Sequence, residues 1–175
     1  GVKCGSRHVM LAVAPPNHPA GHRGSWLLLG ADDYVARWAR RQQNSYASHL
    51  DMCVGVMRDS VTTGRAGAEL VGAFAFNHYN GCDAELHFYG PGTLKKDIVR
   101  AIFGIALQRF NLQRLTVRTR SPAMARGMRK LGAVFECRQL RVYGPTDAPE
   151  HAAEQYVFYR ERMERLARGG SSDVR

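Results

Sequence analysis

The sequence has few cysteines, no long apolar run and far fewer acidic than basic side chains. Its four cysteines are widely spaced and include no C-x-x-C pair, so no zinc site is expected, although two disulfides remain open from sequence alone. Sparse cysteine fits a reducing compartment better than secretion. No apolar run approaches the ~20 residues that span a bilayer. These absences predict a soluble protein of the cytoplasm, without contact with a membrane.

Charge is the most unusual feature of the 175 residues: 25 Lys and Arg stand against 15 Asp and Glu, a net charge of +10. A basic surface attracts anions, and the candidates are nucleic acid, an acidic protein, an anionic membrane and a polyphosphate cofactor. Aromatic residues do not interleave with the arginines between Arg114 and Arg141, as a nucleic-acid stacking platform requires. The charge therefore favours a cofactor or an acidic macromolecular partner over nucleic acid.

Hydrophobic periodicity predicts alternating strands and helices in one domain. Residues 1–25, rich in Pro and Gly, are expected to be an extension with one short strand at 9–13, and residues 169–175 a flexible tail. The expected strands of the 26–168 domain are 25–30, 52–57, 70–79, 83–89, 115–119, 134–142 and 154–162, the last turning into a terminal helix, and the other expected helices are 32–43, 93–110 and 122–131. This order predicts a mixed α/β (α+β) sheet with helices packed on it.

Two short motifs set details of this arrangement. Asn80-Gly81 is a strong hairpin signal between two strands. The sequence GPGT at 90–93, before a helix, presents free N–H donors and a positive dipole end to an anion, and Lys95 and Lys96 add charge there. The alternative is a plain strand-to-helix turn with exposed lysines.

A histidine pair at 18 and 22 has the i, i+4 spacing of some metal sites. That use needs a helix, and Pro19 and Gly21 argue against one, so no metal is expected.

The stretch from residue 69 to 162 carries a family resemblance. It contains the hairpin VGAFAFNHYNGCDAELHFYG, the loop and helix GPGTLKKDIVRAIFGIALQRF, the strand LQRLTVRT and the helix SPAMARGMRKLGAVFE. In this order they resemble the GNAT superfamily of N-acetyltransferases. LLLGADDYVARWARR is similar to the first strand and helix of phage-encoded members, and RQLRVYG with QYVFYRERMERL to the end of the ribosomal-protein-modifying branch. The resemblance covers residues 26–168 and implies a GNAT-type mixed, mostly antiparallel central sheet flanked by helices.

The resemblance implies that acetyl-CoA is the cosubstrate and that no metal takes part. The backbone of residues 88–90 would pair with the pantetheine arm, and the loop and helix start after it would hold the phosphates. The implied cofactor-binding residues are Phe88, Tyr89, Gly90, Gly92, Thr93, Leu94, Lys95, Lys96 and Ser121.

Strand alternation places Glu85, His87 and Tyr89 on one face of the strand at 83–89. In the family a Glu on this strand often serves as the base, so Glu85 is the first candidate and His87 the second, since an imidazole titrates near neutrality. Tyr143 is a candidate acid on a late strand. The alternative is that this face of the strand is merely solvated.

Three positions depart from the family pattern. Leu94 and Lys96 occupy the two glycine positions of its loop, and Met128 stands where the family commonly has a proton-donating Tyr.

The resemblance and these departures leave two candidate functions. The first is acetyl transfer to an amine, weakly a protein N-terminus or lysine, in the cytoplasm (the host cytoplasm for a phage protein). The alternative is a catalytically inactive GNAT-fold protein, such as a phage factor, that binds a host or acidic macromolecular partner.

Overall fold

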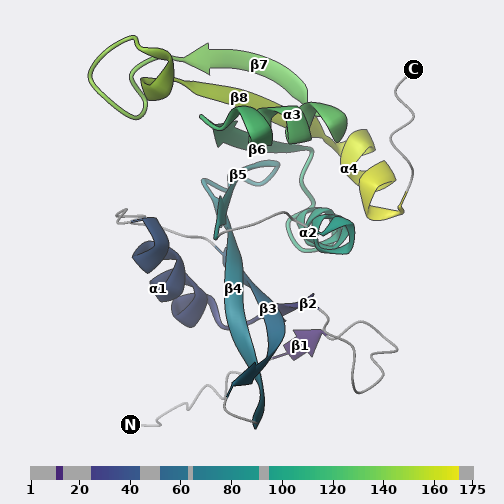
Figure 1. Ribbon diagram of the computed structural model, residues 1–175. Helices are drawn as coiled ribbons and strands as arrows, with labels where there is room; N and C mark the ends of the chain where they lie inside the picture. The colour runs from purple at the N-terminus through teal and green to yellow at the C-terminus, as the bar shows by residue number, and fades with distance from the viewer. Residues whose placement is uncertain (1–10, 14–24, 44–51, 63–64, 91–94, 170–175) are drawn as a thin grey trace, which may run out of the picture. The chain divides into compact units, whose positions relative to one another are not determined.

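The computed structural model describes residues 11–13, 25–43, 52–62, 65–90 and 95–169 (Figure 1). The chain divides into two compact units, one of residues 1–75 with 88–93 and the other of residues 76–87 with 94–175. No helix within the described ranges is long and apolar enough to cross a membrane.

The first unit contains a sheet with one helix. Its strands are β1 (Leu11–Val13), β2 (Ser25–Leu29), β3 (Met52–Thr62) and most of β4 (Arg65–Asn77), which lie in that order, and its helix is α1 (Asp32–Gln43). β1 pairs antiparallel with β2, and β2 with β3. β1 thus comes from the segment that the sequence predicts to be an extension.

Charged side chains at both ends of helix α1 complement its dipole. Asp32 and Asp33 lie in its first turn and Arg40 and Arg41 in its last, which complements the helix dipole. The Oδ1 atom of Asp32 also accepts a hydrogen bond of 2.7 Å from the backbone N–H of Cys53, which ties the start of the helix to β3. The apolar side of α1 packs into the core of this unit with Leu28, Val35, Ala39, Cys53, Ala73, Ala75 and Tyr89.

The second unit is a four-stranded sheet with three α-helices. Its strands follow the spatial order β5 (Asp83–Tyr89), β6 (Arg114–Thr119), β8 (Ala153–Tyr159) and β7 (Val134–Gln139), although the last two residues of β5 belong to the first unit. The helices are α2 (Lys96–Gln108), α3 (Pro122–Lys130) and α4 (Arg160–Ala167). β5 and β6 are parallel because α2 crosses over between them, and the other two pairs are antiparallel.

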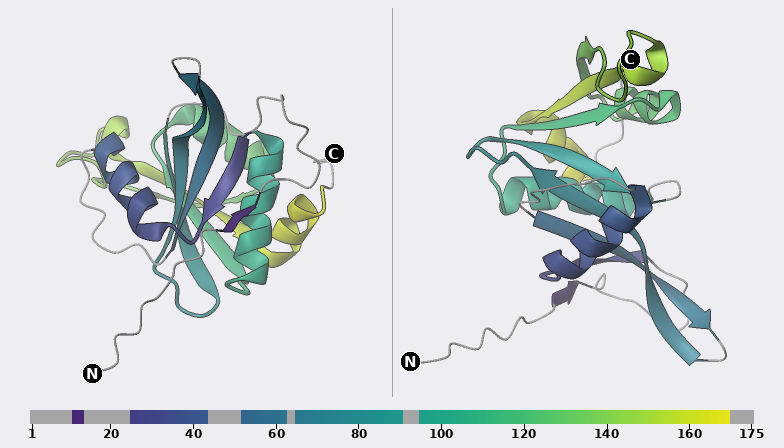
Figure 2. Two further views of the ribbon diagram at one scale, coloured as in Figure 1. Left: turned by 90° about the horizontal axis from the view of Figure 1, so that it is seen from below. Right: turned by 90° about the vertical axis from the view of Figure 1, so that its left-hand side faces the viewer.

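The two faces of this second sheet differ in polarity. On one face Leu115 of β6 lies opposite Phe158 of β8, and the ring of Phe158 is 4.8 Å from Phe103 of α2. Tyr156, on the same face, lies beneath Arg129 of α3 at 5.4 Å. Helix α4 packs alongside α2 (Figures 1 and 2). The opposite face carries polar side chains at alternate positions of β5 and β6, and these form the candidate site.

The predicted order of strands and helices and the mixed α/β class are confirmed. The connection at residues 78–82 turns as Asn80-Gly81 predicts: Asn80 Oδ1 accepts from the backbone N–H groups of Cys82 (3.2 Å) and Asp83 (2.9 Å), and Gly81 has φ +98°.

The boundaries of several elements differ from the prediction. β3 and β4 are longer than predicted, and α2 begins at Lys96. β7 ends at Gln139 rather than at 142, because Arg141 adopts φ +59° and its Nε atom donates to Asp147 at 2.6 Å. A short 3₁₀-helix, Pro149–His151, then precedes β8.

Candidate active site

A buried carboxylate lies at the centre of the polar face. The Glu85 residue is 6% exposed, and it accepts two hydrogen bonds from the guanidinium of Arg118, from Nε to Oε1 at 2.6 Å and from Nη2 to Oε2. Parallel pairing sets this contact, because Glu85 of β5 lies beside Thr116 of β6 and Arg118 follows on the same face. A guanidinium that donates both hydrogen bonds fixes the plane of the carboxylate.

The same carboxylate contacts an imidazole. His87 lies two residues further along β5, and its Nε2 atom is 3.2 Å from Glu85 Oε1. The His87 side chain is about one-third exposed (34%), whereas that of Glu85 is 7% exposed. The structure therefore brings two candidate catalytic residues together, the buried one anchored and the outer one accessible.

Tyr89 does not join them. Its side chain is 4% exposed and packs in the core of the first unit. The alternative, that this face of the strand is merely solvated, does not hold for Tyr89. The chain next to it departs from regular strand geometry: Gly90 has φ +132°, and a Cβ there would lie 2.8 Å from the carbonyl oxygen of Val71. Only glycine fits this position without strain.

Electrostatics keep Glu85 charged. Burial raises its pKa, but the hydrogen bonds from His87 and Arg118 and their positive charges outweigh burial and lower the pKa from 4.5 to about 2. In return, the hydrogen bond that Arg118 donates to the carboxylate raises the pKa of Arg118. A carboxylate this acidic takes up protons poorly near neutrality, whereas it holds an adjacent imidazole in one orientation.

A chain of amides on the neighbouring strands supports the arginine on the same face of the sheet. Arg118 Nη1 donates to Gln139 Oε1 (3.4 Å), and Gln139 Nε2 donates to Gln155 Oε1 (3.0 Å). Gln155 in turn donates to Glu136 at 2.5 Å. The residues come from β6, β7 and β8, so the position of Arg118 depends on all three strands. Sequence analysis missed these amides, because their contacts join three strands that are far apart in the sequence.

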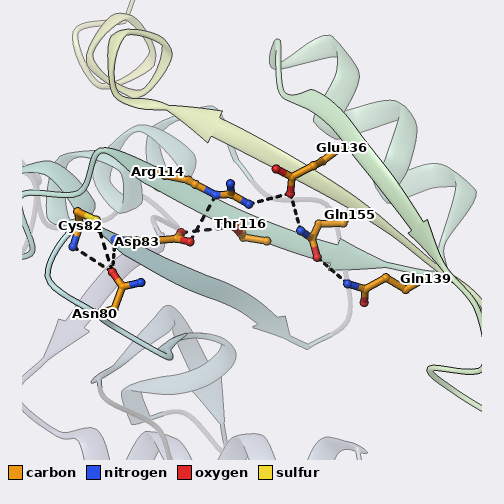
Figure 3. A network of polar contacts seen from close by, with 8 residues as sticks. All are labelled: Asn80, Cys82, Asp83, Arg114, Thr116, Glu136, Gln139 and Gln155. Carbon is orange, nitrogen blue, oxygen red and sulfur yellow. Dashed lines mark hydrogen bonds and ion pairs between the residues drawn. The ribbon is translucent and has the colours of Figure 1, made fainter.

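A second arginine closes the network at the other end of β6. Arg114 Nη2 donates to Glu136 Oε2 at 2.7 Å, and its Nε atom lies 3.4 Å from Asp83 Oδ2 (Figure 3). Asp83 Oδ1 also accepts from the hydroxyl of Thr116 at 3.5 Å. The polar face is thus a continuous series of contacts from Asp83 to Glu85.

Tyr143 lies near this site but not on a strand. It follows the end of β7, its backbone N–H donates to the His151 carbonyl at 2.9 Å, and its side chain is exposed. The expectation of a late-strand tyrosine is therefore corrected. The guanidinium carbon of Arg120 is 5.1 Å from the centre of its ring.

The predicted cofactor-binding residues fall in three groups. Phe88, Tyr89 and Gly90 belong to the first unit, whereas Gly92, Thr93 and Leu94 lie outside the described residues. In the second unit Lys95 and Lys96 begin α2 with exposed side chains, and no side chain caps this helix start.

Helix α3 has a regular start and a buried centre. Ser121 caps it: its Oγ accepts from the backbone N–H of Met124 at 3.4 Å, and Pro122 follows. Met128 is buried, so it packs the helix against the sheet and supplies no proton. In the part of the chain that the structure describes, no group of three His, Cys, Asp or Glu could hold a metal ion.

We predict that Glu85→Gln removes a contribution to the free energy of unfolding that the parent protein has at neutral pH and loses at acid pH. Because folding lowers the pKa of Glu85, its contribution is complete above about pH 4.5 and is lost as the pH falls toward about 2. A pKa lowered from 4.5 to about 2 corresponds to about 3 kcal/mol at neutral pH. Urea unfolding from pH 7 to pH 2 should therefore show a steeper loss of unfolding free energy in the parent protein than in Glu85→Gln.

The control for this measurement is Glu69→Gln. Glu69 pairs with Arg58 at 2.6 Å, but both side chains are about half exposed (48% and 56%), and an exposed pair contributes little. Its pH profile should follow that of the parent protein. Parallel profiles for Glu85→Gln and the parent would contradict a charged, clamped Glu85.

Comparison with solved structures identifies proteins that share this fold. No protein-family model matches the sequence, and no curated protein matches it. A mutant of spermidine N-acetyltransferase SpeG from Vibrio cholerae superposes with a TM-score of 0.52 and 9% identity over 75% of each chain. A candidate acetyltransferase from T. thermophilus gives 0.51 and 14% identity over 71% of this chain and 66% of that one.

Another candidate acetyltransferase matches with a TM-score of 0.51 and 15% identity, over 67% of this chain and 63% of its own. The chain thus spans less than two thirds of the length of that protein. Identities this low establish the fold only. The chain has the mixed α/β, mostly antiparallel fold of GNAT-type acetyltransferases.

Proposed function

We propose that this protein is an acetyl-CoA-dependent N-acetyltransferase that moves an acetyl group to an amine by direct attack. One observation carries the proposal: in an acetyltransferase fold, a buried Glu85 carboxylate is clamped by Arg118 and contacts the partly exposed imidazole of His87. Proton transfer is what an amine acceptor requires, because only a neutral amine attacks a thioester.

We assign the base to His87 and the anchoring role to Glu85. Acetyl-CoA supplies an activated thioester. The amine nitrogen forms the new C–N bond, the C–S bond breaks with its electron pair going to sulfur, and His87 takes the amine proton directly or through water. Glu85 is a weak base, because its own pKa is about 2, and it therefore stays ionised beside the imidazolium that results. Its negative charge balances the positive charge of the ring.

The leaving thiolate has no obvious donor on α3, because Met128 is apolar and buried. Tyr143 is the remaining candidate acid, exposed and close to Arg118 and Arg120. A CoA thiolate is a tolerable leaving group, so the reaction does not depend on this donor alone.

For acetyl-CoA we propose the binding residues that the family resemblance implies, and we assign them to the parts of the acetyl-CoA molecule that they would contact. The uncapped start of α2 with Lys95 and Lys96 offers N–H groups and positive charge to phosphates. Ser121 lies at the start of α3, and the backbone of Phe88, Tyr89 and Gly90 pairs with the pantetheine arm. Gly92, Thr93 and Leu94 remain sequence predictions. We assign the transferase domain to residues 26–168, between an extension at 1–25 and a tail at 169–175.

The acceptor that we propose is a protein amine, at an N-terminus or a lysine. SpeG is named for spermidine, a polycation. A chain with a net charge of +10 repels a polycation such as spermidine. It attracts a protein of opposite net charge, even when that protein carries the acceptor amine.

A catalytically inactive binding protein is the second candidate, favoured by the burial of Met128 in place of a proton donor. Isothermal titration with acetyl-CoA distinguishes the two functions. The enzyme should bind acetyl-CoA at micromolar concentrations, and Lys95→Ala/Lys96→Ala should weaken binding about tenfold because two charges near the phosphates are lost.

The matched control is Arg37→Ala/Arg41→Ala, which removes the same charge from exposed positions of α1. It should leave the titration unchanged. Absence of binding at high micromolar acetyl-CoA would rule out the enzyme.

We further predict that His87→Gln lowers kcat by about 10²-fold to 10⁴-fold, the usual range for loss of a general base. The measurement is transfer of radiolabelled acetyl from acetyl-CoA to spermidine and to an unstructured peptide with a free N-terminus and internal lysines. The KM for acetyl-CoA should stay constant. An unchanged kcat in His87→Gln would assign the proton transfer elsewhere.

A further inference from the structure

A groove of about 620 Å³ lies in the second unit, away from the polar face that holds Glu85. It is formed by the end of β6, the outer side of α3, β7 and the 3₁₀-helix before β8. Its charged lining consists of Arg120, Arg126, Arg129, Arg138, Glu150 and Glu154. A volume of this size accommodates a small ligand or a few residues of a peptide.

Most of the positive charge in this groove is not neutralised by the protein. Arg129 Nη2 pairs with Glu154 Oε2 at 3.0 Å. The other three arginines, Arg120, Arg126 and Arg138, form no ion pair within the described ranges. Four guanidinium groups therefore face two carboxylates, which leaves a cationic lining.

Two of the guanidinium groups are held in place by aromatic rings. Arg120 lies 5.1 Å from the ring centre of Tyr143, and Arg129 lies 5.4 Å from that of Tyr156. Arg126 extends from the exposed side of α3, three residues before Arg129, and Arg138 reaches the groove from β7. The positive groups thus come from three parts of the chain: the end of β6, α3 and β7.

The chemistry of the lining distinguishes among anions. Glu150 and Glu154 repel a continuous phosphate backbone, and the groove lining contains no aromatic side chain on which bases could stack. Pro122, Pro149 and Ala152 supply apolar surface between the charges, which suits the aliphatic part of a peptide. Guanidinium forks bind carboxylates with two parallel hydrogen bonds.

We propose that this groove binds a short acidic peptide segment of a protein partner, with its carboxylates paired to Arg126 and Arg138. Arg126 and Arg138 lie apart from Glu85 and His87, although the same groove is also lined by Ser121 of the proposed acetyl-CoA set, and Arg120 of its lining lies beside Tyr143.

The test uses the full chain and a fluorescein-labelled hexaglutamate peptide, followed by fluorescence anisotropy at low salt, with hexaglutamine as the uncharged control peptide. Arg126→Gln/Arg138→Gln should weaken hexaglutamate binding about tenfold. Neither arginine has an ion pair to lose within the described ranges, so the fold should be retained, which circular dichroism checks. Arg37→Gln/Arg41→Gln removes the same charge from α1 and should change the affinity less than twofold.

Three outcomes would overturn the proposal. Equal weakening in both double variants would mean that hexaglutamate senses only net charge. Tighter binding of single-stranded (dT)₁₀ or of pyrophosphate than of hexaglutamate, abolished by Arg126→Gln/Arg138→Gln, would reassign the groove to a phosphate ligand. Absence of hexaglutamate binding would leave the groove without the proposed occupant.

Discussion

The ion pair between Glu85 and Arg118 is the interaction on which the candidate site depends. A carboxylate that is 6% exposed is stable as an anion only when its lone pairs are satisfied, and here a guanidinium and an imidazole satisfy them. The pair also needs the parallel register of β5 and β6, which aligns Glu85 with Thr116. Loss of Arg118 would leave the buried Glu85 carboxylate with His87 alone, so the pair links the geometry of the sheet to the protonation state of the site.

The rest of the second unit is arranged around this constraint. Helices α2 and α3 pack on one face of the sheet, which leaves the opposite face for polar groups from four strands. Gln139 and Gln155 extend the contacts of Arg118 across β7 and β8, so the guanidinium has little freedom to turn away from Glu85. The face is therefore a preorganised polar surface on which Glu85 is buried and the imidazole of His87 is partly exposed.

Local patterns in the sequence predict much of this arrangement. Alternation along 83–89 places Glu85 and His87 on one face, and hydrophobic periodicity locates the helices α1, α2 and α3. The pairing of Glu85 with Arg118 could not be predicted in this way, because it joins residues 33 positions apart through the register of two strands. Tyr89 shows the same limit: strand alternation assigns it to the face of His87, but the end of the strand packs into the core of the first unit. The early end of β7 depends on the conformation of Arg141, which no periodicity encodes.

The most direct measurement is the titration of Glu85 itself by NMR, with ¹³C-labelled glutamate and Glu85→Gln to assign the side-chain carboxyl resonance. A clamped carboxylate beside His87 and Arg118 should stay ionised through the acid range and titrate with a pKa of about 2. Titration at or above 4.5, the value of an unperturbed glutamate, would show that the clamp does not form and would remove the basis for assigning His87 as the base.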